Sequence, residues 1–178
     1  MIDSPVPIIG FAAYSGCGKT TLLKKLIPLL RDKGLRLAVI KHAHHGFEID
    51  HPGKDSFELR KADACQVLIA SARRKALVTE YEPHQSEPGL TELLKDLDLD
   101  RCDLVLVEGF KAERFPKIEL HRCTFKSPYL YPGDSDIIAL AADGPVEAPL
   151  PVLDINEPQT VADFIFSTCY EQRKTTQL

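Results

Sequence analysis

The chain has 178 residues, 44% hydrophobic and 27% charged, a composition typical of a soluble globular protein large enough to bury a core. It contains no apolar run of about 18 residues and no N-terminal signal pattern, so we expect no membrane partner and a cytoplasmic location. The net charge of −4 argues against a nucleic-acid partner, because binding a phosphate backbone requires a basic face. The five scattered cysteines indicate neither a disulfide framework nor a zinc knuckle. We expect one domain over residues 1–178, with a frayed tail at residues 174–178.

The first predicted elements are a buried strand, a glycine-rich loop and a helix. Residues 7–12 form a short apolar run, and residues 20–33 carry leucine and isoleucine at helical spacing. Between them, residues 13–21 match the phosphate-binding pattern G-x-x-x-x-G-K-[ST], except that Ala13 replaces the first glycine. Strand, loop and helix in this order favour a phosphate site over a glycine-rich turn with a coincidental lysine.

The residue types of this loop suit a nucleoside triphosphate. Gly16 and Gly18 can adopt the positive-φ conformations that turn backbone N–H groups inward around an anion. Lys19 adds a mobile positive charge for the β- and γ-phosphates, and the Thr20 hydroxyl can ligate Mg²⁺ bound to the same oxygens. We therefore predict a catalytic contribution from Lys19. The predicted nucleotide-binding residues of the loop are Ser15, Gly16, Cys17, Gly18, Lys19, Thr20 and Thr21.

A second strand is predicted at residues 35–40, followed by a long polar segment. Four of the six histidines lie in this segment: His42, His44, His45 and His51. With Asp50 they could bind Zn²⁺ or Ni²⁺, because imidazole is a common transition-metal ligand. Their spacing fixes no metal geometry, so we favour the alternative that the histidines and Lys41 contact a nucleotide or another anion.

The next part of the chain predicts short elements with an antiparallel pair. The pattern indicates a helix at residues 55–62, strands at residues 66–70 and 76–80, and a helix at residues 90–97 after a linker at residues 83–89. Asp55 or Ser56 is expected to cap the first helix. The turn between the strands carries Arg73, Arg74 and Lys75, most simply as a solvated hairpin tip.

The strand predicted at residues 103–108 ends in an acid. Four apolar residues followed by Glu108 resemble the second nucleotide signature, in which a carboxylate at a strand's end holds Mg²⁺ directly or through water. We predict that Glu108 serves the metal together with Thr20, and that Gly109 lets the backbone pass near the γ-phosphate. An apolar strand ending in Glu is common, so this prediction depends on its pairing with residues 13–21.

The last third predicts strands at residues 118–122, 136–142 and 150–154 and a helix from Pro158 to about residue 173. The first of these strands is expected toward a sheet edge. Asp143 could accept hydrogen bonds from N1–H and N2–H₂ of guanine, or could simply form an Asp-Gly turn. Taken together, the elements predict an α/β fold: a P-loop NTPase-like, mostly parallel sheet flanked by helices, with an added antiparallel β segment.

With these residues in place, the chain resembles the MobB family, the GTP-binding protein of molybdopterin-guanine dinucleotide biosynthesis. The resemblance covers nearly the whole chain. It is carried by residues 11–23, 40–45, 52–56 with 58–62, 106–111 and 153–156. Several of these are specific to the family rather than to phosphate loops in general.

The resemblance implies a homodimer that binds GTP with Mg²⁺ and has weak GTPase activity. It also implies partners, namely the guanylyltransferase that joins GMP to molybdopterin and proteins that carry molybdopterin. Residue by residue, it implies phosphate binding by the loop, metal binding by Thr20 and Glu108, and a second metal-binding or water-positioning carboxylate at Asp50. Arg60, Lys61 and the histidine segment become candidates for a pterin-phosphate or partner surface.

Three other functions fit the same loop. A nickel- or zinc-insertion GTPase would use the histidines as metal ligands. A small-molecule kinase would need an arginine-rich lid, for which only Arg73, Arg74 and Lys75 are a local candidate. A binding module without significant turnover would differ from the first function only in its kinetics.

Overall fold

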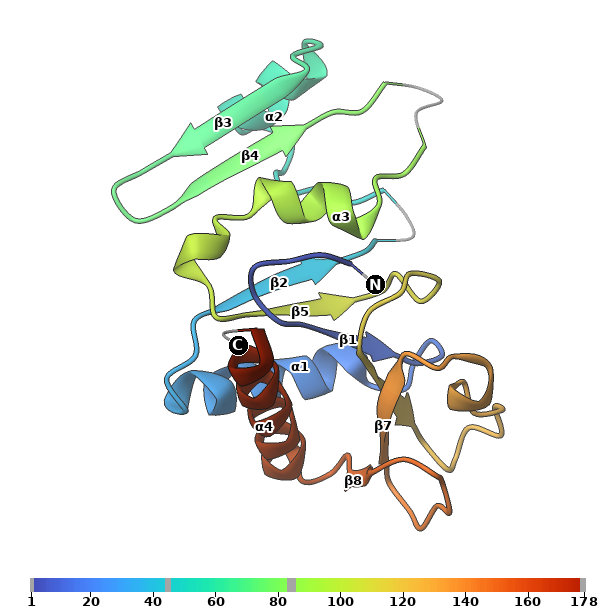
Figure 1. Ribbon diagram of the computed structural model, residues 1–178. Helices are drawn as coiled ribbons and strands as arrows, with labels where there is room; N and C mark the ends of the chain where they lie inside the picture. Colours follow the sequence, from blue (N-terminus) through green and yellow to red (C-terminus); the bar gives the residue numbers. More distant parts are fainter. Residues whose placement is uncertain (1, 44–45, 83–85, 177–178) are drawn as a thin grey trace. The chain divides into compact units, whose positions relative to one another are not determined.

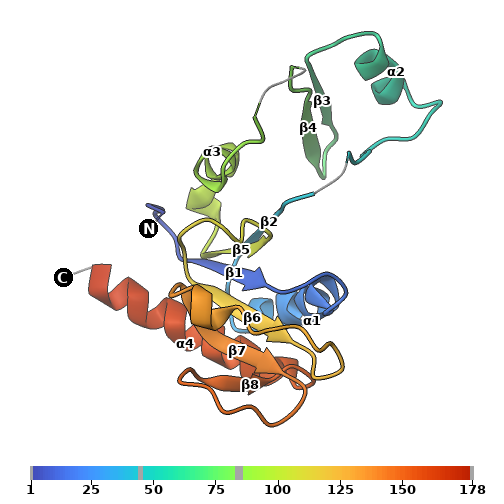
Figure 2. The same cartoon turned by 90° about the vertical axis from the view of Figure 1, so that its right-hand side faces the viewer.

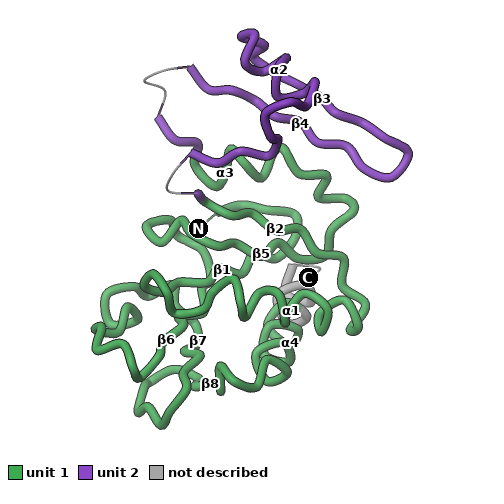
Figure 3. Tube along the Cα trace, turned by 180° about the vertical axis from the view of Figure 1, so that it is seen from behind, with its two compact units in different colours: residues 1–42, 89–178 green, residues 43–88 purple. Residues whose placement is uncertain are grey.

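The structure, a computed structural model, describes residues 2–43, 46–82 and 86–176, with side chains up to residue 169. The chain divides into two compact units, a larger one of residues 1–42 and 89–178 and a smaller one of residues 43–88 (Figure 3). A single domain over residues 1–178 stays a prediction. Two of the candidate metal ligands, His44 and His45, lie outside the described residues. The same is true of residues 177–178, the end of the predicted frayed tail.

A six-stranded parallel sheet is the centre of the larger unit. Its strands are β1 (Ile8–Ala12), β2 (Leu37–Lys41), β5 (Leu104–Glu108), β6 (Lys117–His121), β7 (Ile137–Ala142) and β8 (Val152–Asp154). Their order is β2-β5-β1-β6-β7-β8, with every neighbouring pair parallel. Figure 2 shows β1, β6, β7 and β8 following one another across the sheet. The predicted mostly parallel sheet is confirmed. The loops that follow its strands therefore lie together at the carboxyl ends of the strands.

Helices cover both faces of this sheet, because its strands carry apolar side chains on each side. Helices α1 (Lys19–Asp32) and α4 (Pro158–Thr176) share one core with alternate residues of β1, β5 and β6 (Figure 1). On the opposite face, α3 (Leu90–Leu93) and η1 (Leu94–Asp96) bury Leu90 and Leu94 against β1, β2 and β5. Two further single turns are η2 (Leu99–Arg101) and η3 (Tyr131–Gly133).

Strand β6 lies between β1 and β7, so the expectation of a strand toward the edge was wrong. Its alternating polar residues resemble a solvent-facing strand, yet Lys117 and Glu119 are each 1% exposed. The Lys117 ammonium donates to the Glu113 carbonyl at 2.6 Å and pairs with Asp134 at 3.0 Å. Buried charges persist when they are paired and hydrogen-bonded, and the pattern of the strand alone does not reveal such partners.

The smaller unit contains one short helix and one hairpin: α2 (Asp55–Lys61), β3 (Gln66–Ala70) and β4 (Lys75–Thr79). The predicted antiparallel pair is confirmed, with its basic turn exposed. The predicted cap was wrong: the residue preceding α2 is Lys54, and no side chain among the described residues caps the helix. Asp55 instead lies in the first turn, where its negative charge faces the positive end of the helix. Arg60 pairs with Glu48 and, at 2.8 Å, with Glu80.

We expect Glu119→Gln to lower the free energy of unfolding by about 1–3 kcal/mol. The buried Glu119 carboxylate accepts from the backbone N–H groups of Leu130 and Tyr131, both at 2.9 Å. A glutamine has only one acceptor oxygen, so one of these N–H groups would lose its partner. Urea denaturation measures the change, with the exposed Glu147→Gln as control. A midpoint shift no larger than that of the control would contradict the prediction.

Candidate functional site

The loop between β1 and α1 has the backbone conformation that its glycines predict. Gly16 and Gly18 have φ values of 83° and 89°, and α1 begins at Lys19. Ala13, which replaces the first glycine of the pattern, is fully buried in the core and does not have a positive φ. Alanine therefore meets the backbone requirement at that position. Cys17 is also buried in this core, consistent with a small side chain that faces inward.

Lys19 folds back over its own loop. Its ammonium donates to the carbonyl oxygens of Ala13 and Tyr14, both at 3.3 Å. These bonds hold a positive charge beside the two glycines, where backbone N–H groups can surround an anion.

Thr20 and Glu108 meet, although 88 positions separate them in the chain. The Thr20 hydroxyl lies 3.3 Å from each carboxylate oxygen of Glu108 and donates to them. Lys41, at the end of β2, has its ammonium 3.8 Å from the same carboxylate. The contact arises because β5 neighbours both β1 and β2, so the ends of the three strands lie together. The structure thus brings the two predicted metal-binding residues to one place.

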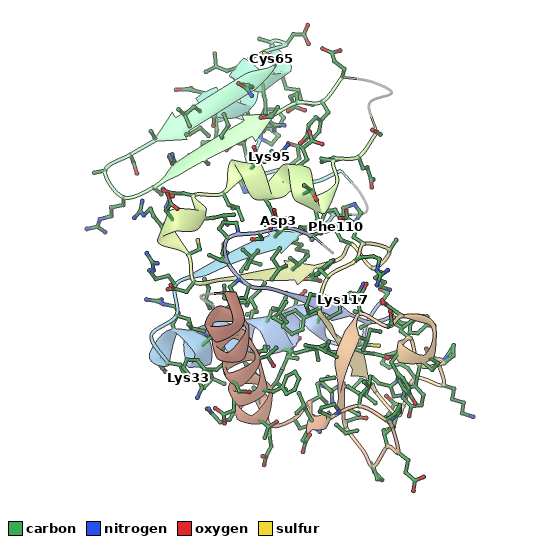
Figure 4. The ribbon with its side chains drawn as sticks, viewed as in Figure 1. Asp3, Lys33, Cys65, Lys95, Phe110 and Lys117 are labelled. Atoms are coloured by element: carbon green, nitrogen blue, oxygen red, sulfur yellow. The ribbon has the colours of Figure 1, made fainter. Side chains whose placement is uncertain are left out.

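Gly109 is required by packing as well as by its conformation. Its φ is 111°, and a Cβ atom there would lie 2.5 Å from the Cβ of His42. The ring of the next residue, Phe110, lies 4.8 Å from the His42 ring, centroid to centroid. Phe110 and Lys117, both labelled in Figure 4, lie near the two ends of the connection from β5 to β6. The predicted approach of Gly109 to a γ-phosphate stays a prediction.

Lys111 lies just beyond the carboxyl end of β5, and the sequence patterns assigned no role to it. Its ammonium lies 5.5 Å from the centroid of the Tyr14 ring in the phosphate loop. Burial of the ammonium lowers the pKa of Lys111, and the positive charge of Lys19 lowers it further. A basic residue three positions beyond a parallel strand that ends in Glu108 is the signal that could have identified it.

Asp143 follows β7 and is engaged within the protein. One of its carboxylate oxygens accepts from the backbone N–H of Cys123 at 2.7 Å, and the other lies 3.4 Å from Arg122 Nη1. The Cys123 N–H is the main cause of a lowered Asp143 pKa, with Arg122 contributing. Whether Asp143 also reads guanine stays a prediction. Arg122 was not identified from the sequence, although it directly follows a parallel strand.

Asp50 and His51 belong to the smaller unit, whereas His42 belongs to the larger one. One carboxylate oxygen of Asp50 is buried and has no hydrogen-bond partner among the described residues. Among the residues that the structure describes, no group of three or more His, Cys, Asp or Glu side chains could hold a metal ion. His44 and His45 lie outside that part of the chain, so the metal-binding alternative stays untested. Within the described ranges, no helix is long and apolar enough to cross a membrane.

Comparison with known proteins agrees with this architecture. A family model described as MobB, molybdopterin guanine dinucleotide synthesis protein B, matches residues 8–143. The chain is 46% identical over 168 residues to the molybdopterin-guanine dinucleotide biosynthesis adapter protein of Escherichia coli strain K12, covering 94% of this chain and 95% of that protein. It is 43% identical over 164 residues to the Haemophilus influenzae protein of the same name, covering 92% and 90%.

A solved structure supports the same relationship at the level of the fold. The crystal structure of a molybdopterin-guanine biosynthesis protein B matches with a TM-score of 0.69 and 26% identity, covering 90% of this chain and 99% of that one. The similarity therefore extends over most of this chain and nearly all of that one. By sequence and by structure, the chain belongs to the MobB family.

Proposed function

We propose that this protein binds GTP with Mg²⁺, hydrolyses it slowly, and acts as an adapter in molybdopterin-guanine dinucleotide biosynthesis. The observation that best supports a nucleotide site is that three groups lie together at the carboxyl ends of the strands. These are the positive-φ glycines of the loop, the Lys19 ammonium above them, and the contact between Thr20 and Glu108. The adapter role is supported by the names of the Escherichia coli and Haemophilus influenzae relatives.

In this proposal the loop residues bind the phosphates by charge and by backbone N–H groups. Residues 15–21 surround the β-phosphate, and Lys19 leaves its two carbonyl partners to contact the β- and γ-phosphate oxygens. The peptide dipoles of α1, which begins at Lys19, add a favourable field for an anion.

The Thr20 hydroxyl and the Glu108 carboxylate fit a Mg²⁺ ion, because both offer the oxygen ligands that this hard cation prefers. When bound, the ion would neutralise negative charge on the β- and γ-phosphate oxygens. Asp50 is our candidate for a second metal ligand or for positioning the attacking water. We expect hydrolysis to be slow because the sequence offers no evident strong general base, and phosphoryl transfer depends mainly on positioning and charge stabilisation.

The proposed partners follow from the proposed adapter role. We expect the protein to work as a cytoplasmic homodimer beside the guanylyltransferase that joins GMP to molybdopterin, and to contact molybdopterin-carrying proteins. Arg60, Lys61 and the histidine segment remain candidates for the pterin-phosphate or partner surface. Guanine preference, for which Asp143 is a candidate, belongs to the same proposal.

We expect Lys19→Ala to weaken GTP binding by about 10- to 100-fold, because a charged hydrogen-bond donor to the phosphates is lost. Calorimetric titration of GTP, GDP and ATP with Mg²⁺ measures this, with and without the guanylyltransferase. The control is Lys25→Ala, which removes an exposed lysine from the same helix. Unchanged GTP binding by Lys19→Ala would contradict the site, and equal or tighter binding of ATP would contradict the guanine preference.

We expect Glu108→Gln to remove most of the Mg²⁺ dependence of GTP binding. The neutral amide holds the cation less strongly than the carboxylate does, so affinity should fall by about tenfold with Mg²⁺ and change little with a chelator present. Glu92→Gln, an exposed change on α3, is the control. If the variant and the control show the same ratio of affinities with and without Mg²⁺, Glu108 does not serve the metal.

A further inference from the structure

The turn that follows β6 lies against the phosphate loop at both of its glycines. The Phe125 N–H donates to the Arg122 carbonyl at 2.9 Å and closes the turn. The Phe125 ring comes within 3.6 Å of the position that a Cβ atom on Gly16 would take. Arg122 Nη2 lies 3.9 Å from the corresponding position on Gly18. A guanidinium so close to the anion-binding backbone adds positive charge from the β6 side.

Two other loops hold this guanidinium in place. Arg122 Nη1 donates to Asn156 Oδ1 at 2.9 Å, beyond β8, and to Asp143 Oδ2 at 3.4 Å, beyond β7. Asp143 Oδ1 in turn accepts from the Cys123 N–H, which fixes the carboxylate. Both of these side-chain hydrogen bonds are donated by Arg122 Nη1, whereas Nη2 is the guanidinium nitrogen that lies against Gly18.

We propose that Arg122 Nη2 donates to a phosphate oxygen of the nucleotide bound at residues 13–21, and that Asp143 and Asn156 are positioning residues that aim it. The inference rests on the proposed function, because it requires a nucleotide in this loop. Guanidinium groups suit this task, since they stay charged and offer several donors in a fixed plane. Anchoring one nitrogen in the protein leaves the other already oriented, which reduces the conformational entropy lost on binding.

The arrangement favours a phosphate over the base as the target. Gly18 directly precedes Lys19 and Thr20, the residues that contact phosphates in loops of this pattern. A donor against Gly18 therefore faces the same anion. The two carboxylate oxygens of Asp143 accept from Cys123 N–H and from Arg122 Nη1. In this inference Asp143 acts by positioning the arginine, which is an alternative to direct recognition of guanine by its carboxylate.

The test compares Arg122→Ala and Arg122→Lys with wild type in binding GTP and inorganic tripolyphosphate, the latter by displacement of a fluorescent GDP. Arg122→Ala should weaken both ligands by a similar factor of about tenfold or more, and Arg122→Lys should lose less. The control is Arg114→Ala. Arg114 also pairs with an aspartate, Asp136, but it precedes β6 and so lies at the amino ends of the strands, away from the phosphate loop. Thermal unfolding without nucleotide checks that each variant is folded.

The outcomes separate this inference from the proposed function. Wild-type protein that binds no nucleotide would refute both. If wild type binds GTP but Arg122→Ala binds both ligands equally well, or loses GTP while keeping tripolyphosphate, only the inference about Arg122 is refuted. If Arg122→Ala does not fold, the comparison of Arg122→Lys with wild type decides, and undiminished affinity of that variant for both ligands refutes the proposal.

A double-mutant cycle tests the role of Asp143. Asp143→Asn should weaken GTP binding in wild type but add little in the Arg122→Ala background, because both changes remove the same phosphate contact. The preference for GTP over xanthosine triphosphate should not change. An equal loss in both backgrounds, or a shift toward the xanthine nucleotide, whose C2 carbonyl an asparagine amide can bind, would overturn the positioning role.

Discussion

The pairing of β1 with β5 on one side and β6 on the other is the constraint on which the site depends. Parallel registers align Phe11 with Glu108 and Ala12 with Glu119. The phosphate loop that follows β1 therefore emerges between the loops that follow β5 and β6. The first neighbour brings Glu108 to Thr20, and the second brings Arg122 to Gly18. Both contacts depend on β1 lying between β5 and β6.

Buried polar residues of β6 hold the surrounding loops in place. Lys117 holds the connection from β5 through the Glu113 carbonyl, and Glu119 holds the turn at η3 through two N–H groups. At the end of the strand, the His121 ring lies 4.3 Å from the Tyr129 ring, centroid to centroid. Each polar group is costly to bury alone but stabilising when paired, so these contacts favour one loop arrangement over alternatives.

Local charge at the site differs in sign from the charge of the whole chain. The net charge is −4, yet four basic residues lie at or just beyond the carboxyl ends of the strands: Lys19, Lys41, Lys111 and Arg122. Burial of its ammonium lowers the pKa of Lys111, and the positive charge of nearby Lys19 lowers it further. Mutual repulsion of this kind is relieved by an anion of several charges, which a triphosphate supplies. A small basic site on an acidic protein suits a small anionic ligand better than a long nucleic acid.

Sequence patterns alone determined the phosphate loop, the apolar strands and the α1 helix, because these depend on local periodicity and on glycine conformations within a few residues. They also indicated the hairpin, and they predicted that Thr20 and Glu108 serve one metal ion because the two nucleotide signatures act on the same ion. The strand order was decided only by the tertiary structure. The alternating charged residues of β6 predicted a strand toward the sheet edge, but in the structure these residues are buried and paired with groups in distant loops. The same holds for Arg122, which reaches Gly18, Asp143 and Asn156 only after three separate strands align their ends. Such contacts join residues far apart in the chain, so no local pattern can encode them.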